Sequence, residues 1–433
     1  MKLLLAALLS GLGLAWGWDV YNAVPSDAHP WWVARQELLY LSGVLAIGLM
    51  SLATYLASRP VWLETPLGGM DRVYRTHKWA GILGGSFAIL HWLVEMSDDI
   101  LKSSIGRSGR VPKEQFGNVL DRLRDLAEDL GEWGFYIVIA LIVLTLWQRF
   151  PYRPWRFLHR AMPVIYLALA FHAVLLAPPD YWTQPLGLLL APLVAAGCYG
   201  ALRALLANIG RERRVSGKVA EIEPLGSDLL RVRCQLDADW PGHRAGQFAL
   251  VTFDESEGPH PFTIASADRG DGSIDFCIKA LGDYTRRLRA TLAVGAPLTV
   301  EGPYGRFDLA RRRAQARQLW VAGGIGVTPF LAWLEAQRKA AEPVQAELHY
   351  CTRDRSNDPL VDRLQALCAG LPGIRLQIHG AAQGETLDAT RLLAGGETKA
   401  DVWFCGPAGL GQALRQGLHG AGLRFHQEAF QMR

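Results

Sequence analysis

The sequence predicts a multi-domain fold: a bundle of six transmembrane helices, then a small antiparallel β-barrel, then a doubly wound α/β domain. Three observations support this fold class. The first half of the 433-residue chain contains six apolar stretches, each near the ~20 residues that cross a bilayer core. The part that follows has the pattern of short strands separated by turns. Beyond Arg317, a strand, a glycine-rich turn and a helix begin the alternation that builds parallel sheets.

The loops between the apolar stretches differ in charge. Arginine and lysine gather after the second, fourth and sixth stretches, and aspartate in the other loops. By the positive-inside rule, the basic loops and both chain ends lie in the cytoplasm, although residues 1–17 could instead be a cleaved signal peptide. We therefore expect a multi-pass protein of the inner, cytoplasmic membrane with cytoplasmic soluble domains. The stretches lie at about 3–18, 36–57, 79–96, 133–148, 161–177 and 185–206.

The composition argues against several other functions. A formal net charge of +4 is too small to indicate nucleic-acid binding, and no basic run is interleaved with aromatic residues. Five of the six cysteines lie beyond residue 207, the sixth is Cys198 in the last apolar stretch, and they show no C-x-x-C. This spacing indicates neither a disulfide framework nor a zinc or iron–sulfur site, so we expect the soluble half to occupy a reducing compartment.

Four histidines lie within or at the ends of the apolar stretches and form two pairs. His77 and His91 are 14 residues apart, and His159 and His172 are 13 apart. On helices this gives axial separations of about 21 and 20 Å, so the pairs form two layers across the membrane. Two facing imidazoles in each layer could hold a haem iron, whereas a single histidine could equally be a packed polar residue. A spacing of 13 requires a helix distortion, which Pro163 can supply.

The soluble half divides into two patterns. Short strands are predicted near 216–223, 229–234, 247–253, 274–279 and 298–301, as in a small antiparallel barrel. Later strands near 318–322, 346–351, 374–379 and 401–405 alternate with helices, which predicts a parallel doubly wound sheet. Gly323, Gly324 and Gly326 follow the first of these strands. Such a turn exposes backbone amides to a pyrophosphate, although it departs from G-x-G-x-x-G and could be only a tight connection.

The order of the motifs resembles one known family. The chain is similar to the NADPH oxidase and ferric reductase superfamily, whose transmembrane haem domain also has histidine spacings of 14 and 13. The resemblance implies domains at 1–207 (transmembrane, haem), 208–312 (FAD-binding barrel) and 313–433 (NAD(P)H-binding). The motifs are His260-Pro-Phe-Thr-Ile-Ala-Ser, Ile278-Lys-Ala-Leu-Gly-Asp-Tyr-Thr, Glu301-Gly-Pro-Tyr-Gly, Gly323-Gly-Ile-Gly-Val-Thr-Pro-Phe and Phe404-Cys-Gly-Pro.

The resemblance also implies which residues bind the cofactors. A flavin would lie against His260, Pro261, Phe262 and Thr263, with its diphosphate near Lys279 and the turn Gly282, Asp283, Tyr284 and Thr285. The nicotinamide nucleotide would be held by Gly323, Gly324, Gly326, Val327 and Thr328, and its nicotinamide by Cys405, Gly406 and Pro407. Phe430 would shield the flavin. Arg353, with Arg355, favours a 2′-phosphate and so NADPH over NADH.

The resemblance implies an oxidoreductase that passes electrons from cytoplasmic NADPH through FAD and two b-type haems. The haem ligands would be His77 with His159 and His91 with His172, and the acceptor outside the membrane would be O₂, giving superoxide, or a ferric chelate. Two alternatives remain: a membrane-anchored flavin reductase, or a haem subunit that feeds a separate partner protein.

One departure from the family concerns the acceptor side. Animal oxidases of this family carry a further histidine where this chain has Glu95. Glu95, Asp98 and Asp99 could form an acidic rim that holds Fe(III), or they could be ordinary solvated carboxylates.

Overall fold

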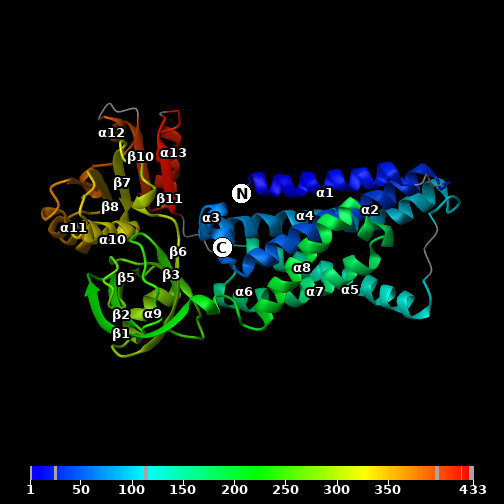
Figure 1. The fold of residues 1–433 in the computed structure, drawn as a ribbon, viewed down its shortest axis with the longest axis horizontal. Coiled ribbons are helices and arrows are strands. Elements are labelled where there is room, and N and C mark those ends of the chain that lie inside the picture. Colours follow the sequence, from blue (N-terminus) through cyan, green and yellow to red (C-terminus); the bar gives the residue numbers. More distant parts are fainter. Residues whose placement is uncertain are drawn as a thin grey trace. The chain divides into compact units, whose positions relative to one another are not determined.

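The computed structural model describes residues 2–23, 27–111, 116–147, 149–394, 399–420 and 422–428. The chain divides into two compact units, which we call the membrane unit (Met1–Ile209) and the soluble unit (Gly210–Met432). Figure 1 shows the helices of the first and the two sheets of the second.

All the secondary structure described in the membrane unit is helical. Six of its helical segments are long and apolar enough to cross a membrane, and one of these spans both α6 and α7. This confirms the predicted six-span bundle. The helices are α1 (Lys2–Asn22), α2 (Pro30–Ala57), α3 (Val61–Leu67), α4 (Met70–Ile105), α5 (Asn118–Leu146), α6 (Tyr152–His159), α7 (Met162–Leu176) and α8 (Pro185–Leu205).

Helix α2 lies at the centre of the membrane unit. It packs against α1, α4, α7 and α8, and its second half is almost continuously buried. Gly200 of α8 permits one of these contacts, because a Cβ there would lie 2.7 Å from the backbone oxygen of Thr54. Small residues at such crossings let two helices approach closely, which is a main source of helix association in a bilayer.

The fifth span is interrupted where the histidine spacing requires it. Helix α6 ends at His159, and α7 begins at Met162 with a proline in its first turn. A proline is well tolerated there because it has no N–H to donate. The predicted distortion near Pro163 therefore takes the form of a break between two helices. Helix α5 begins at Asn118 and continues through the predicted fourth span to Leu146.

The soluble unit begins with an antiparallel barrel. Its strands are β1 (Arg214–Leu225), β2 (Leu229–Leu236), β3 (Phe248–Thr252), β4 (His260–Thr263), β5 (Ser273–Lys279) and β6 (Pro297–Tyr304). They pair in the order β4-β3-β6-β1-β2-β5, and a bridge between Ile264 and Phe276 links the two ends of the sheet. Helix α9 (Asp283–Thr291) follows β5. Apolar side chains such as Val232 and Val300 fill the interior.

A parallel sheet forms the rest of the soluble unit. Its strands are β7 (Arg317–Gly323), β8 (Ala346–Thr352), β9 (Ile374–Gly380), β10 (Ala400–Cys405) and β11 (Arg424–Glu428), in the order β11-β10-β7-β8-β9. The helices are α10 (Thr328–Gln337), α11 (Pro359–Ala369), α12 (Ala389–Leu393) and α13 (Ala408–Gly417). The order reverses between β7 and β10, which is where ligands bind in such sheets. This confirms the predicted doubly wound domain.

Aromatic packing joins the barrel to the parallel sheet. Phe307, after β6, stacks on Trp333 of α10 with ring centres 4.9 Å apart, and both rings meet Trp403 of β10 edge-on. The Trp333 indole N–H also donates to the backbone oxygen of Ala245, in the loop before β3. All three rings are almost fully buried. Burial of such large apolar surfaces holds the two domains together.

Candidate redox sites

The four histidines of the membrane unit form two facing pairs. His77 of α4 and His159 of α6 have ring centres 6.3 Å apart, and His91 of α4 and His172 of α7 have ring centres 6.2 Å apart. In each pair the two rings are nearly perpendicular, at 83° and 87°. Residues distant in sequence thus meet in two similar arrangements one above the other along α4.

Backbone carbonyls orient three of the four imidazoles. The Nδ1 atoms of His77, His91 and His172 lie 2.8, 2.9 and 2.7 Å from the backbone oxygens of Ala53, Leu39 and Ala127. Because a carbonyl only accepts, Nδ1 carries the proton and Nε2 keeps its lone pair. This is the tautomer of a histidine that ligates a metal through Nε2.

The fourth imidazole is oriented by a ring. His159 stacks on Trp155 with ring centres 5.1 Å apart, and within the described residues its buried Nδ1 has no hydrogen-bond partner. Glycines make room for the rings of the other pair. A Cβ at Gly43 would lie 3.2 Å from the His91 ring, and a Cβ at Gly131 would overlap the His172 ring. Sequence analysis did not identify either glycine, since the neighbouring helix is known only from the fold.

The spacing of both pairs fits a single metal ion between two axial imidazoles. A bond from imidazole nitrogen to a transition metal is about 2 Å, and the nitrogen lies about 1 Å from its ring centre, so two axial rings have centres about 6 Å apart. In the described part of the chain no third His, Cys, Asp or Glu joins either pair. Two neutral imidazoles are the donor set of a bis-histidine haem, so these residues fit two haems.

The predicted flavin-binding residues converge on one side of the barrel. His260 of β4 stacks on Tyr284 of α9 with ring centres 4.2 Å apart, and Phe262 lies next to His260. At the start of α9 the Thr285 hydroxyl oxygen accepts from the backbone N–H groups of Leu281 and Gly282, 3.1 and 3.0 Å away. The result is an aromatic surface beside a helix N-terminus, which suits a ring system that carries a diphosphate.

Two further groups define the charge near this surface. Lys279, at the end of β5, forms an ion pair with Asp228 at 3.4 Å, with the lysine side chain about one-third exposed. Burial, followed by the nearby Asp254 and Glu257 carboxylates, raises the pKa of Tyr284 to about 12. The phenol is therefore neutral at physiological pH, and Lys279 is one cation near this surface that could face a diphosphate.

The predicted nucleotide-binding residues meet where the strand order reverses. After β7, Gly324–Val327 form a 3₁₀ turn, and α10 begins at Thr328. A Cβ at Gly326 would overlap the backbone oxygen of Cys405, and a Cβ at Gly323 would lie 2.6 Å from the Pro407 ring. These glycines let the ends of β7 and β10 approach closely, leaving backbone amides at the edge where a pyrophosphate binds.

The other predicted site residues differ in burial, and one of them lies outside the described part of the chain. The Cys405 thiol is buried, which raises its pKa well above the ordinary value and keeps it protonated. Arg353 follows β8 and is exposed, whereas Arg355 pairs with Glu385 at 2.9 Å. Phe430 lies outside the described residues.

The acidic residues after His91 do not form an open metal site. Glu95 accepts from Arg35 at 2.9 Å, and Asp98 pairs with Lys102 at 2.5 Å and Arg110 at 3.0 Å. Cations thus offset the carboxylates that sequence analysis considered for Fe(III). The pairing was not foreseen because Arg35 is 60 residues away from Glu95.

Two protein families match the chain. Residues 42–170 match "Ferric reductase like transmembrane component", and residues 214–308 match "FAD-binding domain". The carnitine monooxygenase reductase subunit of Escherichia coli (strain K12) is 33% identical over 46% of this chain and 62% of that protein. Respiratory burst oxidase homolog protein E of Arabidopsis thaliana is 27% identical over 46% of this chain and 23% of that protein. The chain thus spans less than two thirds of either relative.

One solved structure resembles the fold. A flavohemoglobin from Malassezia yamatoensis superposes with a TM-score of 0.51 over 92% of this chain and 98% of that one, at 18% identity. The two family matches describe a membrane domain followed by an FAD-binding domain, whereas the flavohemoglobin match shows the fold alone. The chain thus fuses a ferric-reductase-like transmembrane domain to an FAD-binding domain, as the motifs indicated.

Proposed function

We propose that this protein carries electrons from cytoplasmic NADPH across the membrane, through FAD and two b-type haems, to O₂ or a ferric chelate outside. FAD, when bound, accepts the electron pair of a hydride and releases single electrons, which is what a haem can accept. The observation that carries the proposal is the repeated spacing of the two histidine pairs, 6.3 and 6.2 Å between ring centres.

The chain's own residues would bind and orient the cofactors. His77 and His159 would hold one haem, and His91 and His172 the other. In His77, His91 and His172 the Nδ1 hydrogen bonds to backbone oxygens leave Nε2 available as a ligand. Since α4 carries one histidine of each pair, the separation along one helix sets the distance between the layers.

In the soluble unit, different segments would hold the two other cofactors. The β4 strand and the start of α9 would hold the flavin, while the glycine turn after β7 and the end of β10 would hold the nucleotide. Exposed Arg353 would face a 2′-phosphate, which supports NADPH over NADH. We further propose domain limits at 1–207, 208–312 and 313–433.

The charge of the loops supports the proposed direction of electron transfer across the membrane. The basic loops after the second, fourth and sixth spans support a cytoplasmic location for the soluble domains and an outer position for the His91–His172 pair. The charged cluster of Arg35, Glu95 and Asp98 then lies at the outer end of α4. Because its charges are largely paired, it supports a diffusible acceptor such as O₂ or a chelate rather than a bound metal ion.

A second candidate is electron supply to a partner protein. The carnitine monooxygenase reductase subunit, which is similar to 46% of this chain, is by its name the reductase subunit of a monooxygenase. If this chain works in the same way, NADPH oxidation will require a further protein.

One experiment separates these functions. The protein is purified in detergent, reduced with NADPH without oxygen, and then exposed either to air with a superoxide probe or to ferric citrate. Two b-type haems per chain, reduced by NADPH and reoxidised with stoichiometric superoxide, support the oxidase. Reoxidation by ferric citrate but not by air supports the metal reductase. Haem reduction without reoxidation by either acceptor supports the partner protein, and flavin without haem contradicts the histidine assignment.

A further inference from the structure

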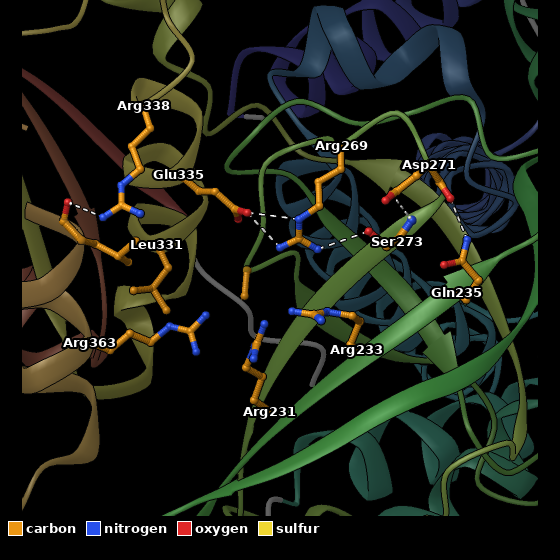
Figure 2. A pocket seen from close by; sticks show the side chains of 12 residues that line it. Arg231, Arg233, Gln235, Arg269, Asp271, Ser273, Leu331, Glu335, Arg338 and Arg363 are labelled. Carbon is orange, nitrogen blue, oxygen red and sulfur yellow. Dashed lines mark hydrogen bonds and ion pairs between the residues drawn. The ribbon is translucent and has the colours of Figure 1, made fainter. Parts of the chain in front are cut away.

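The soluble unit contains a cavity that none of the predicted cofactor residues line. Its volume is about 510 Å³, in the range of small-molecule sites. One wall is the outer face of β2 and the segment before β5, and the other is formed by α10 and α11 (Figure 2). Five arginines line it: Arg231, Arg233, Arg269, Arg338 and Arg363.

Secondary structure brings these arginines together. Arg231 and Arg233 alternate along β2, so both point to the outer face of the barrel. On the opposite wall, Glu335 lies near the end of α10 and Arg338 follows it, while Arg363 is on α11. Figure 2 shows the Arg363 guanidinium directed toward those of Arg231 and Arg233. Arginines from the barrel and from the parallel-sheet domain therefore line the same cavity.

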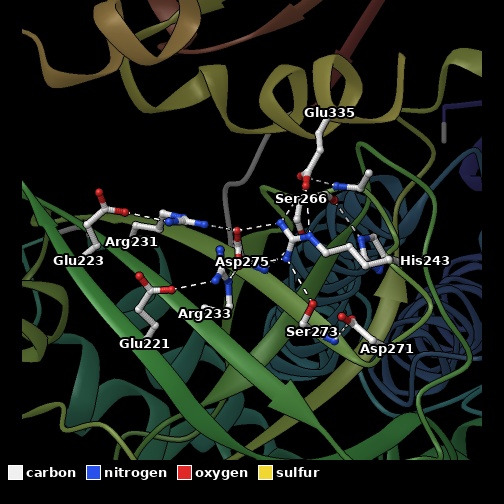
Figure 3. Close-up of polar contacts among 12 residues, drawn as sticks. Glu221, Glu223, Arg231, Arg233, His243, Ser266, Asp271, Ser273, Asp275 and Glu335 are labelled. Atoms are coloured by element: carbon white, nitrogen blue, oxygen red, sulfur yellow. Dashed lines mark hydrogen bonds and ion pairs between the residues drawn. The ribbon is translucent and has the colours of Figure 1, made fainter. Parts of the chain in front are cut away.

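The buried carboxylates are too few to neutralise these cations. Asp275, whose side chain is 1% exposed, accepts from Arg231, Arg233 and Arg269 at 2.7, 3.0 and 3.0 Å (Figure 3). Glu335 accepts from Arg269 at 2.9 Å. Three guanidinium groups thus share a single buried carboxylate.

The other nearby carboxylates are more exposed. Glu223 pairs with Arg231 and Glu221 with Arg233, both at 2.8 Å, but their side chains are 43% and 49% exposed. Water and salt screen such surface pairs, so they offset the inner charge only in part. Asp271 also lines the cavity and is exposed. By formal charge the five arginines are balanced by five carboxylates, but the buried part of the wall holds more guanidinium groups than carboxylates.

Two of the arginines that line the cavity have hydrogen-bond donors without a partner among the described residues. The Nε atom of Arg231 is buried and has no hydrogen-bond partner within the described residues. The half-buried Arg363 side chain makes no hydrogen bond or ion pair with the described part of the chain. Arg338 uses one nitrogen on the backbone oxygens of Ala366 and Leu367, 3.0 and 3.3 Å away. A buried donor without a partner is costly, and an anion in the cavity would satisfy these groups.

We propose that this cavity binds a small molecule that carries a phosphate or diphosphate group. Guanidinium forks match the oxygen geometry of phosphate, and several of them favour a ligand with at least two negative charges. A ligand between Arg231 on the barrel and Arg363 on α11 would join the two domains of the soluble unit. Binding would therefore stabilise this arrangement of the two domains.

Inorganic pyrophosphate is the probe for this proposal. Its binding to the full-length, FAD-loaded protein is measured by titration calorimetry at constant ionic strength, with saturating NADP⁺ to occupy the nucleotide site. We expect saturable binding that R363Q weakens at least tenfold, because the mutation removes the cation at the centre of one wall, and that R363K weakens less. R375Q, which changes an arginine on β9 outside the cavity, is the matched control and should bind like the wild type.

Two kinds of result would overturn the proposal. One is that the wild type binds neither pyrophosphate nor short-chain phosphatidic acid. The other is that R363Q binds pyrophosphate as tightly as the wild type, or that wild-type binding seen without NADP⁺ disappears once NADP⁺ saturates the nucleotide site. A second titration with short-chain phosphatidic acid identifies the source of the phosphate group. Preference for pyrophosphate indicates a soluble metabolite, and preference for phosphatidic acid indicates a lipid headgroup.

Discussion

Glu335 of α10 and Arg269, in the segment before β5, are joined by hydrogen bonds of 2.9 and 3.1 Å to one carboxylate oxygen. The other oxygen accepts from the backbone N–H of Ala267 at 3.0 Å. Ala267 follows the predicted flavin-binding strand β4, and α10 begins at the predicted nucleotide-binding turn. One carboxylate thus ties together the segments that would hold the two partners of hydride transfer.

We predict that E335A slows the reduction of bound flavin by NADPH about tenfold, because small displacements of reacting groups are costly. The soluble unit should also lose about 1–3 kcal/mol of stability from the unpaired donors. Stopped-flow absorbance without oxygen measures the first effect. E335Q keeps an acceptor for Ala267 and should lie between E335A and the wild type. Reduction by dithionite should be unchanged in both variants, and an equal slowing there would contradict a positioning role.

The two histidine pairs predict separable haems. H91L removes one ligand of the pair with His172 but leaves His77 and His159 intact, so we expect about one haem per chain instead of two. Extraction of the haem as its pyridine complex measures this ratio. His29 lies outside both pairs and caps α2 by accepting from the Trp31 N–H. H29N keeps a capping group and should retain both haems. Retention of two haems by H91L would disprove the pairing.

Patterns that repeat along the chain were sufficient to predict much of this structure. The six spans, the alternating barrel strands and the two histidine layers all follow from local periodicity, and the break before Pro163 follows from a spacing that an unbroken helix cannot accommodate. The four-residue strand β4 was missed as a strand because it is short and contains Pro261. Its residues were found only by their resemblance to a family motif.

Contacts between distant segments could not be predicted in the same way. Arg231 and Asp275 meet because β2 pairs with β5, and Glu335, from a different domain, reaches this cluster through Arg269. The alternation of Arg231 and Arg233 with apolar residues does indicate an outward arginine pair on one strand. It does not indicate which groups will face that pair, because the partner depends on barrel closure and domain packing.

Close packing at the nucleotide-binding turn gives a further prediction. In G326A the new Cβ would overlap the Cys405 backbone oxygen, and such overpacking costs about 1–3 kcal/mol. We expect the turn to shift, so that the KM for NADPH rises at least severalfold while the FAD content stays the same. Steady-state kinetics and flavin absorbance test this. A Cβ at Gly409 meets nothing within 4 Å, so G409A should leave the KM unchanged. An unaltered KM in G326A would exclude the turn from the nucleotide site.

The arginine cluster around Asp275 predicts how acid affects the soluble unit. Burial acts to raise the pKa of Asp275, but hydrogen bonds from Arg269, Arg231 and Arg233 outweigh it and hold the pKa well below the ordinary value. A carboxyl with a lowered folded-state pKa contributes its full stability above its unfolded pKa of about 4, and loses it as the pH falls through the folded value. The wild-type soluble unit should therefore lose stability progressively below about pH 5.

Replacement of Asp275 tests this dependence. D275N leaves three guanidinium groups without their shared carboxylate, so we expect a loss of about 3–5 kcal/mol at pH 7, as for other broken buried ion pairs. Because the variant lacks the titrating group, its stability should fall less steeply between pH 5 and pH 3 than that of the wild type. Both effects are measured by following the thermal unfolding transition of the soluble unit across this pH range. E221Q removes only the half-exposed partner of Arg233 and should cost at most about 1 kcal/mol. Parallel pH profiles for D275N and the wild type would show that Asp275 does not govern acid sensitivity.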